Sequence, residues 1–155
     1  MDESVLYSEE QSFYPWLIWL IVIACALGII IPVSVGVPFG HSSIWIEILM
    51  FAILLAAFWL FRKLMVVITP TQLIFGFPVW KKKLRLDTIA VGNVVSIPFM
   101  AGAGIHCWRG KTFVNARTGK GVEVTSNDKT YVIGSNSPEL LMESIRSAVA
   151  NWRGQ

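Results

Sequence analysis

Charged residues are scarce in this chain. Only 15% of its 155 residues are Asp, Glu, Lys or Arg, and 54% are hydrophobic, whereas about a quarter of the residues in an ordinary soluble domain are charged. The net charge of +3 is small, while a nucleic-acid binder usually carries a dense basic stripe. The composition therefore favours contact with lipid and argues against nucleic acid as a partner.

Cysteine and histidine are equally scarce, with two of each. Cys25 lies in an apolar run and Cys107 in the polar part, so we expect no disulfide and interpret both as small buried hydrophobes. Neither His41 nor His106 has a second ligand at metal-binding spacing. The AGAG segment at 101–104 lacks the third glycine and the following helix of a phosphate-binding loop. No nucleophile and base match by motif, so we expect no metal, no cofactor and no catalysis.

Two long apolar runs are present instead. Residues 16–37 contain no charge, and as a helix they would cover roughly 33 Å, enough to cross about 30 Å of hydrocarbon. Residues 44–61 form a second run of about 18 residues, near the lower limit for a span. The turn-rich segment PFGHSS joins the two runs. The sequence therefore predicts a two-helix transmembrane hairpin over 16–61, preceded by an acidic leader over 1–15.

Basic residues give the predicted hairpin an orientation. The loop between the two runs has no Lys or Arg, whereas six basic residues follow the second run closely: Arg62, Lys63, Lys81, Lys82, Lys83 and Arg85. Positive residues accumulate on the cytoplasmic side of membrane proteins. We therefore predict a multi-pass protein of the bacterial inner (cytoplasmic) membrane with both termini in the cytoplasm.

The remaining residues, 62–155, have the pattern of one small β-rich domain. Short β-type runs such as LMVVIT and QLIFGF alternate with turn residues. Ser137, Pro138 and Glu139 then provide an N-cap, a first-turn proline and an acid near the helix dipole. The sequence predicts about seven antiparallel strands closed by one C-terminal amphipathic helix, so the expected class is an α+β membrane protein.

Several segments carry a resemblance to a known fold. They are ITPTQLIFGF before a basic strand, LDTIAVGNV, and the run from GIHCWRGKTF to SPELLMESI. Over roughly residues 62–153 the chain resembles the small membrane-anchored bacterial proteins with a pleckstrin-homology-like (PH-like) domain. The resemblance implies a non-catalytic recognition or scaffold role and carries over no active site.

The basic cluster is the first candidate site, and it has two interpretations. The six residues Arg62, Lys63, Lys81, Lys82, Lys83 and Arg85 could contact anionic lipid headgroups, each basic residue near the surface contributing about 1 kcal/mol. Alternatively, the lysines form a solvated edge strand, because lysine protects sheet edges from aggregation. The first interpretation makes the PH-like domain a sensor of a membrane-surface lipid or a small ligand.

The second candidate site lies within the apolar runs. Glu47 is an acid in a predicted membrane helix, where it can reach the interface or pair with a partner helix. Trp19, Phe51 and Trp59 are candidate contacts to a partner, although core or lipid packing explains such rings equally well. We expect an accessory or scaffold subunit that binds membrane lipids and other integral membrane proteins, for example in a respiratory or photosynthetic complex.

Overall fold

The computed structural model describes residues 4–13, 15–36, 42–98 and 103–154. The chain divides into two compact units. Residues 13–60 form one of them, here called the helical unit, and residues 1–12 together with 61–155 form the other, the sheet unit. The helical unit is thus an insertion between the first strand of the sheet unit and the rest of it.

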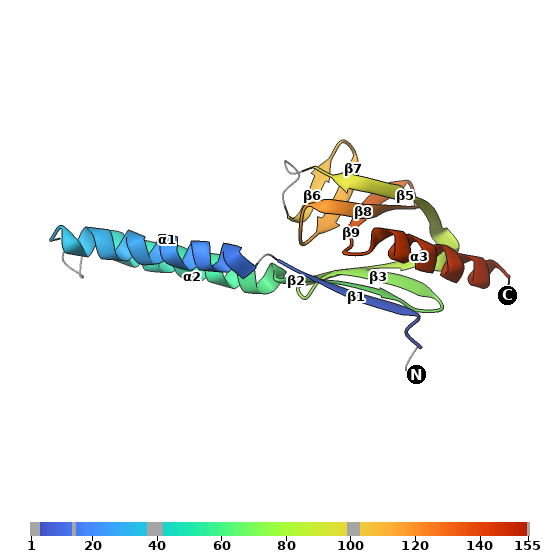
Figure 1. Cartoon of the computed structure of the whole chain (residues 1–155), viewed down its shortest axis with the longest axis horizontal. Coiled ribbons are helices and arrows are strands. Elements are labelled where there is room, and N and C mark those ends of the chain that lie inside the picture. Colours follow the sequence, from blue (N-terminus) through green and yellow to red (C-terminus); the bar gives the residue numbers. More distant parts are fainter. Residues whose placement is uncertain (1–3, 14, 37–41, 99–102, 155) are drawn as a thin grey trace. The chain divides into compact units, whose positions relative to one another are not determined.

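The helical unit is a pair of helices, α1 (Pro15–Ser34) and α2 (Ser42–Phe61), which lie side by side (Figure 1). At one end, the rings of Phe13 and Phe58 meet edge to face with centroids 5.8 Å apart. Further along, a Cβ atom added to Gly28 would lie 3.8 Å from the Glu47 carboxylate. These two contacts show that the helices run antiparallel.

The predicted transmembrane hairpin is wrong. In the part of the chain that the structure describes, neither α1 nor α2 combines the length and the apolar character that a bilayer crossing requires. The span over 16–37 was predicted from uninterrupted apolar residues, but helix α1 ends at Ser34. Residues 37–41 lie outside the described residues. The predictions of an α+β membrane protein and of a multi-pass inner-membrane location depended on this hairpin and are wrong as well.

The sheet unit contains two β-sheets. The first, sheet A, has the strand order β1-β2-β3-β4, and the second, sheet B, has the order β5-β8-β9-β7-β6. The strands of sheet A are β1 (Tyr7–Ser12), β2 (Lys63–Ile68), β3 (Gln72–Phe77) and β4 (Trp80–Arg85). Those of sheet B are β5 (Ile89–Ile97), β6 (Gly104–Trp108), β7 (Lys111–Asn115), β8 (Gly119–Ser126) and β9 (Lys129–Gly134). A short 3-10 helix, η1 (Leu86–Thr88), leads from sheet A to sheet B.

The hydrophobic core lies between the sheets and the C-terminal helix. In β2 and β3, alternate side chains are fully buried, as expected for strands with one face in a core. The core side chains from these two strands are Leu64, Val66, Ile68, Leu73, Phe75 and Phe77. Phe75 meets Tyr131 of β9 edge to face, with ring centroids 5.5 Å apart. This contact joins the inner faces of sheets A and B.

Helix α3 (Pro138–Arg153) covers this core, as the helical spacing of its apolar residues predicts. Leu141 and Ile145 are fully buried, and Val149 is nearly so. The helix contacts β2, β5, β8 and η1 (Figure 1). Its start, Pro138, follows Ser137 as the sequence predicted, although the Ser137 side chain makes no capping hydrogen bond.

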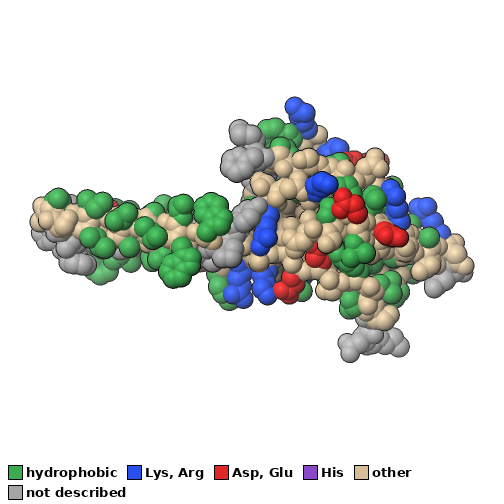
Figure 2. Space-filling view, viewed as in Figure 1, with side chains coloured by type: hydrophobic (Ala, Val, Ile, Leu, Met, Phe, Trp, Pro, Cys, Tyr) green, Lys and Arg blue, Asp and Glu red, His purple; other side chains and the backbone are tan. Residues whose placement is uncertain are grey.

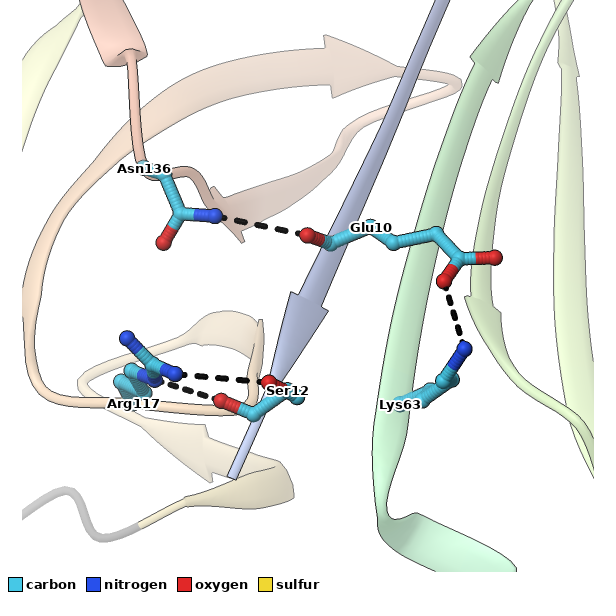
Figure 3. A network of polar contacts seen from close by, with 5 residues as sticks. All are labelled: Glu10, Ser12, Lys63, Arg117 and Asn136. Carbon is cyan, nitrogen blue, oxygen red and sulfur yellow. Dashed lines mark hydrogen bonds and ion pairs between the residues drawn. The ribbon is translucent and has the colours of Figure 1, made fainter. Parts of the chain in front are cut away.

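Strand β1 fastens sheet A to sheet B through polar contacts. Its backbone carbonyls at Glu10 and Ser12 accept hydrogen bonds from the side chains of Asn136 and Arg117 (Figure 3). The Gln11 side chain is buried and accepts a bond from the backbone N–H of Ala116. These donors occupy an edge strand that would otherwise expose unpaired backbone groups.

Two details of the predicted β-domain are wrong. Residues 7–12, interpreted as part of an acidic leader, form β1 and pair with β2 along its whole length. The strands were expected to be all antiparallel, but β7 and β9 pair in parallel, with Phe113 opposite Val132. The hairpins were visible in the sequence because they are local, whereas these two pairings join segments that are not neighbours in the chain.

Candidate interaction surfaces

Large hydrophobic side chains are exposed along both helices of the helical unit. Of 23 such side chains among the described residues, 17 lie between Trp16 and Trp59. Figure 2 shows hydrophobic side chains along the visible face of the helical pair. Monomeric proteins rarely expose a continuous apolar patch larger than about 300–600 Å². This apolar helical surface therefore holds most of the exposed large hydrophobic side chains of the described residues and is the first candidate interaction surface.

The four predicted partner contacts all lie in the helical unit, but with different exposures. Trp19 and Trp59 are 68% and 62% exposed, whereas Phe51 and Glu47 are half-buried. The Oε2 atom of Glu47 is buried and has no hydrogen-bond partner among the described residues. A buried carboxylate oxygen without a donor is costly. Gly28, which has no side chain, leaves room for this carboxylate between the helices.

The predicted basic cluster is divided between two faces of sheet A. Lys81, Lys83 and Arg85 alternate along β4 with side chains that point inward, so they share the outer face. Lys82 lies on the opposite face, where it is half-buried and precedes the buried Leu84 by two positions. The structure therefore brings together three of the four basic residues of this strand.

Two ion pairs reduce the charge of that outer face. Lys63 contacts Glu10 at 2.7 Å, and Arg85 contacts Asp87 at 2.8 Å. Both pairs are partly or fully exposed and so stabilise the fold by less than about 1 kcal/mol. Arg62 lies just before β2 and is exposed. Lys81 and Lys83 form no ion pair within the described part of the chain and supply the remaining positive charge of the face.

The residues considered for metal binding do not converge. The described residues contain no group of three or more His, Cys, Asp or Glu that could hold a metal ion. His106 instead stacks on Phe113, with centroids 5.5 Å apart and rings 6° from parallel, and burial lowers its pKa. Cys25 is half-buried, but Cys107 is exposed, contrary to the expectation that both are buried. His41 and residues 101 and 102 lie outside the described residues.

The contacts that cover the edge of β5 were not predicted from the sequence. Arg146 and Arg153 of α3 donate hydrogen bonds to the backbone carbonyls of Gly92 and Ile89. Two arginines seven positions apart lie on one helical face, which is the only signal the sequence contains. The edge of β5 is therefore occupied in part by donors from the same chain.

Comparison of the chain with protein-family models, with curated proteins and with solved structures found no match. Function must therefore be argued from the surfaces described above.

Proposed function

We propose that this protein is a non-catalytic scaffold that binds a partner protein through the apolar surface of its helical unit. The observation that carries the proposal is the exposure of large hydrophobic side chains on both α1 and α2. Burial of apolar area contributes about 25 cal/mol per Å². Covering this surface with a partner therefore lowers the free energy relative to leaving it in contact with water.

Composition supports a protein partner with apolar helices of its own. The exposed side chains of the helical unit include the tryptophans Trp16, Trp19, Trp45 and Trp59. Tryptophan is enriched among the residues that dominate binding energy at protein interfaces. Glu47 adds specificity, because this residue is only half-buried and its carboxylate can accept a hydrogen bond from a donor on the partner.

The sheet unit supports the scaffold role because it holds the two ends of the helical unit together. It supplies a rigid core and polar contacts that hold both ends of the helical insertion, since Ser12 pairs with Lys63 in the register of β1 and β2. The resemblance to PH-like proteins stays a prediction, and it would imply the same non-catalytic role.

The test is to isolate the tagged full-length protein from its own cells in mild detergent and to measure the mass and composition of the complex. Trp19→Gln and Leu49→Gln change exposed residues of the helical unit, while Leu140→Gln and Val79→Gln are matched controls on exposed residues of the sheet unit. We expect one partner at fixed stoichiometry that is lost from the helical variants and retained by the controls. A free monomer in every case would contradict the scaffold role.

Glu47→Gln tests the specific contact within this proposal. The amide keeps the size of the side chain but replaces a charged acceptor with a neutral one, and hydrogen bonds to charged groups contribute about 1.5–3 kcal/mol. We expect the partner to dissociate at least about tenfold faster. Unchanged dissociation would leave the apolar surface as the whole interface.

A second candidate function rests on the outer face of sheet A, where Lys81, Lys83 and Arg85 flank the half-buried Ile74 and Val67. A sheet face with basic and apolar residues can bind anionic lipid headgroups. The test is sedimentation with phosphatidylglycerol or phosphatidylcholine vesicles. The triple variant Lys81→Gln, Lys83→Gln, Arg85→Gln should lose the preference for the anionic vesicles, whereas Lys120→Gln with Lys129→Gln should keep it. Equal binding to both lipids would contradict this function.

A further inference from the structure

The outer face of sheet B carries a small apolar cluster of its own. Ile97, Phe113 and Val132 are buried there, with Val95 packed against them. Successive side chains of a strand point to opposite faces, so Val132 points away from the core that its neighbour Tyr131 enters. Buried apolar residues on this face do not contribute to the main core, and they need another reason to be there.

A groove of about 200 Å³ lies over this cluster. Its walls include Val95, Ser96, Trp108, Arg109, Lys111 and Phe113. Phe113 is 6% exposed and is backed by the parallel ring of His106, whereas Trp108 is 39% exposed. Typical pockets for drug-sized ligands occupy about 300–1,000 Å³. The groove therefore suits a smaller compound, of the size of one or two fused rings.

The charge at the rim of this groove is positive. Lys111 contacts Glu123 at 2.5 Å, so these two charges compensate each other. Arg109 makes no ion pair among the described residues, and its side chain is exposed at the turn between β6 and β7. The groove thus combines aromatic walls with one uncompensated guanidinium group, which pairs well with carboxylates and stacks on aromatic rings.

The backbone of Arg109 supports a functional reason for this residue. Its φ angle is +50°, and the following Gly110 has φ of +76°. Positions of this kind in two-residue hairpin turns favour Asn, Asp or Gly, and the other such hairpin, between β8 and β9, has Asn127 and Asp128 there. A non-glycine residue without a short polar side chain is strained in this conformation. An arginine here is unfavourable for the turn itself.

We propose that this groove is a binding site for a small aromatic anion. The aromatic body of the ligand lies against Trp108 and Phe113, and its carboxylate or other acidic group pairs with Arg109. The site is on the sheet unit and is independent of the scaffold function proposed for the helical unit.

The test is calorimetric titration of the full-length protein with 2-naphthoate, with 2-methylnaphthalene as the neutral analogue. Arg109→Asn removes the guanidinium group but suits the turn, so the variant keeps the fold. Lys129→Gln removes an exposed charge elsewhere on sheet B and is the matched control. We expect the dissociation constant for 2-naphthoate to rise at least about fivefold in Arg109→Asn and to change less than about twofold in Lys129→Gln.

Three outcomes of the titrations with the wild type and Arg109→Asn would overturn this assignment. They are equal binding of 2-naphthoate to the wild type and to Arg109→Asn, equal binding of the neutral and anionic compounds to the wild type, and no binding at millimolar concentration. Trp108→Ala provides a second measurement. This residue is partly exposed, so its replacement should weaken both compounds without unfolding the sheet. If Trp108→Ala binds both compounds as well as the wild type does, their aromatic bodies lie elsewhere, on the apolar helices for example, and the assignment is overturned.

Discussion

The side-chain oxygen of Gln11 accepts a hydrogen bond of 3.1 Å from the backbone N–H of Ala116, a residue 105 positions later in the chain. Both residues are buried, at 5% and 0% exposure. Strand β1 is part of sheet A through its backbone pairing with β2. The bond from Gln11 connects the same strand to sheet B. The first predictions concern this strand.

Gln11→Ala should destabilise the protein. It leaves the buried N–H of Ala116 without its acceptor, and an unsatisfied buried donor costs about 1–3 kcal/mol. The free energy of unfolding, measured by urea denaturation of the full-length chain, should fall by that amount. Ser8→Ala is the control, because Ser8 is exposed on the same strand and its replacement should change the free energy by less than about 0.5 kcal/mol. Equal effects of the two variants would show that the Gln11 contact does not stabilise the fold.

Tyr7 gives the protein a specific response to alkaline pH. Burial of the side chain, helped by its hydrogen bond to Glu9, raises the pKa of Tyr7 to about 12. Since the unfolded value is about 10, the folded state holds this proton more tightly. Its contribution to stability is complete below pH 10 and is lost as the pH rises towards 12. The unfolding free energy of Tyr7→Phe should therefore fall less steeply over this range than that of the wild type.

Ultraviolet titration of the phenolates checks this assignment directly. The chain has three tyrosines, and Tyr7→Phe should remove the ionisation step near pH 12. If the step removed lies near pH 10 instead, the environment of Tyr7 does not disfavour its charged form.

Gly76 is required by the backbone of β3. Its φ angle is +144°, and a Cβ atom there would lie 2.1 Å from the carbonyl oxygen of Trp80. Gly76→Ala must displace backbone, and we expect it to cost about 2 kcal/mol or more. Gly110→Ala is the control, because φ is also positive but nothing lies within 4 Å of the added atom. Thermal unfolding should show a clearly lower midpoint for Gly76→Ala, and a larger effect at Gly110 would contradict the steric argument.

Two adjacent leucines of α3 test how this helix faces the core. Leu141 is fully buried, whereas Leu140 is 55% exposed. Leu141→Ala should cost about 2–5 kcal/mol through lost burial and the cavity that remains. Leu140→Ala should change the unfolding free energy by less than about 0.5 kcal/mol. Similar losses at both positions would mean that Leu140 is covered in solution.

Periodicity predicted the parts of the fold that depend on local sequence. The alternation of Val122 and Val124 with polar residues and the turn at Asn127 are sufficient to indicate the β8–β9 hairpin. Helix α3 was visible for the same reason, because Leu141 and Ile145 share one helical face. These elements carry their pattern within about a dozen residues.

Strand β1 could not be predicted because its burial is polar. Its sequence, YSEEQS, has no alternation of apolar residues. The partners that connect Glu9 and Gln11 to the rest of the sheet unit are Ser135, Asn136 and Ala116, all more than a hundred positions away. The basic strand was found correctly. Lys82 points away from Lys81 and Lys83 because successive side chains of a strand alternate between its two faces, so the prediction of a single basic cluster could have been refined from the sequence. The membrane hairpin was inferred from the length and apolar character of residues 16–37 and 44–61 and is the main error.

The contacts of β1 also impose an order on how the protein can be made. This strand leaves the ribosome before any of its neighbours, yet it pairs with β2, which follows the whole helical insertion, and bonds to Ala116 and Asn136. Residues up to Asn136 must therefore be synthesised before β1 has all of these partners. Sheet A can form once β4 has been synthesised, but β1 is fastened to sheet B only when Ala116 and then Asn136 follow. A nascent chain interrupted before residue 116 would therefore leave the ribosome with this strand still unattached to sheet B.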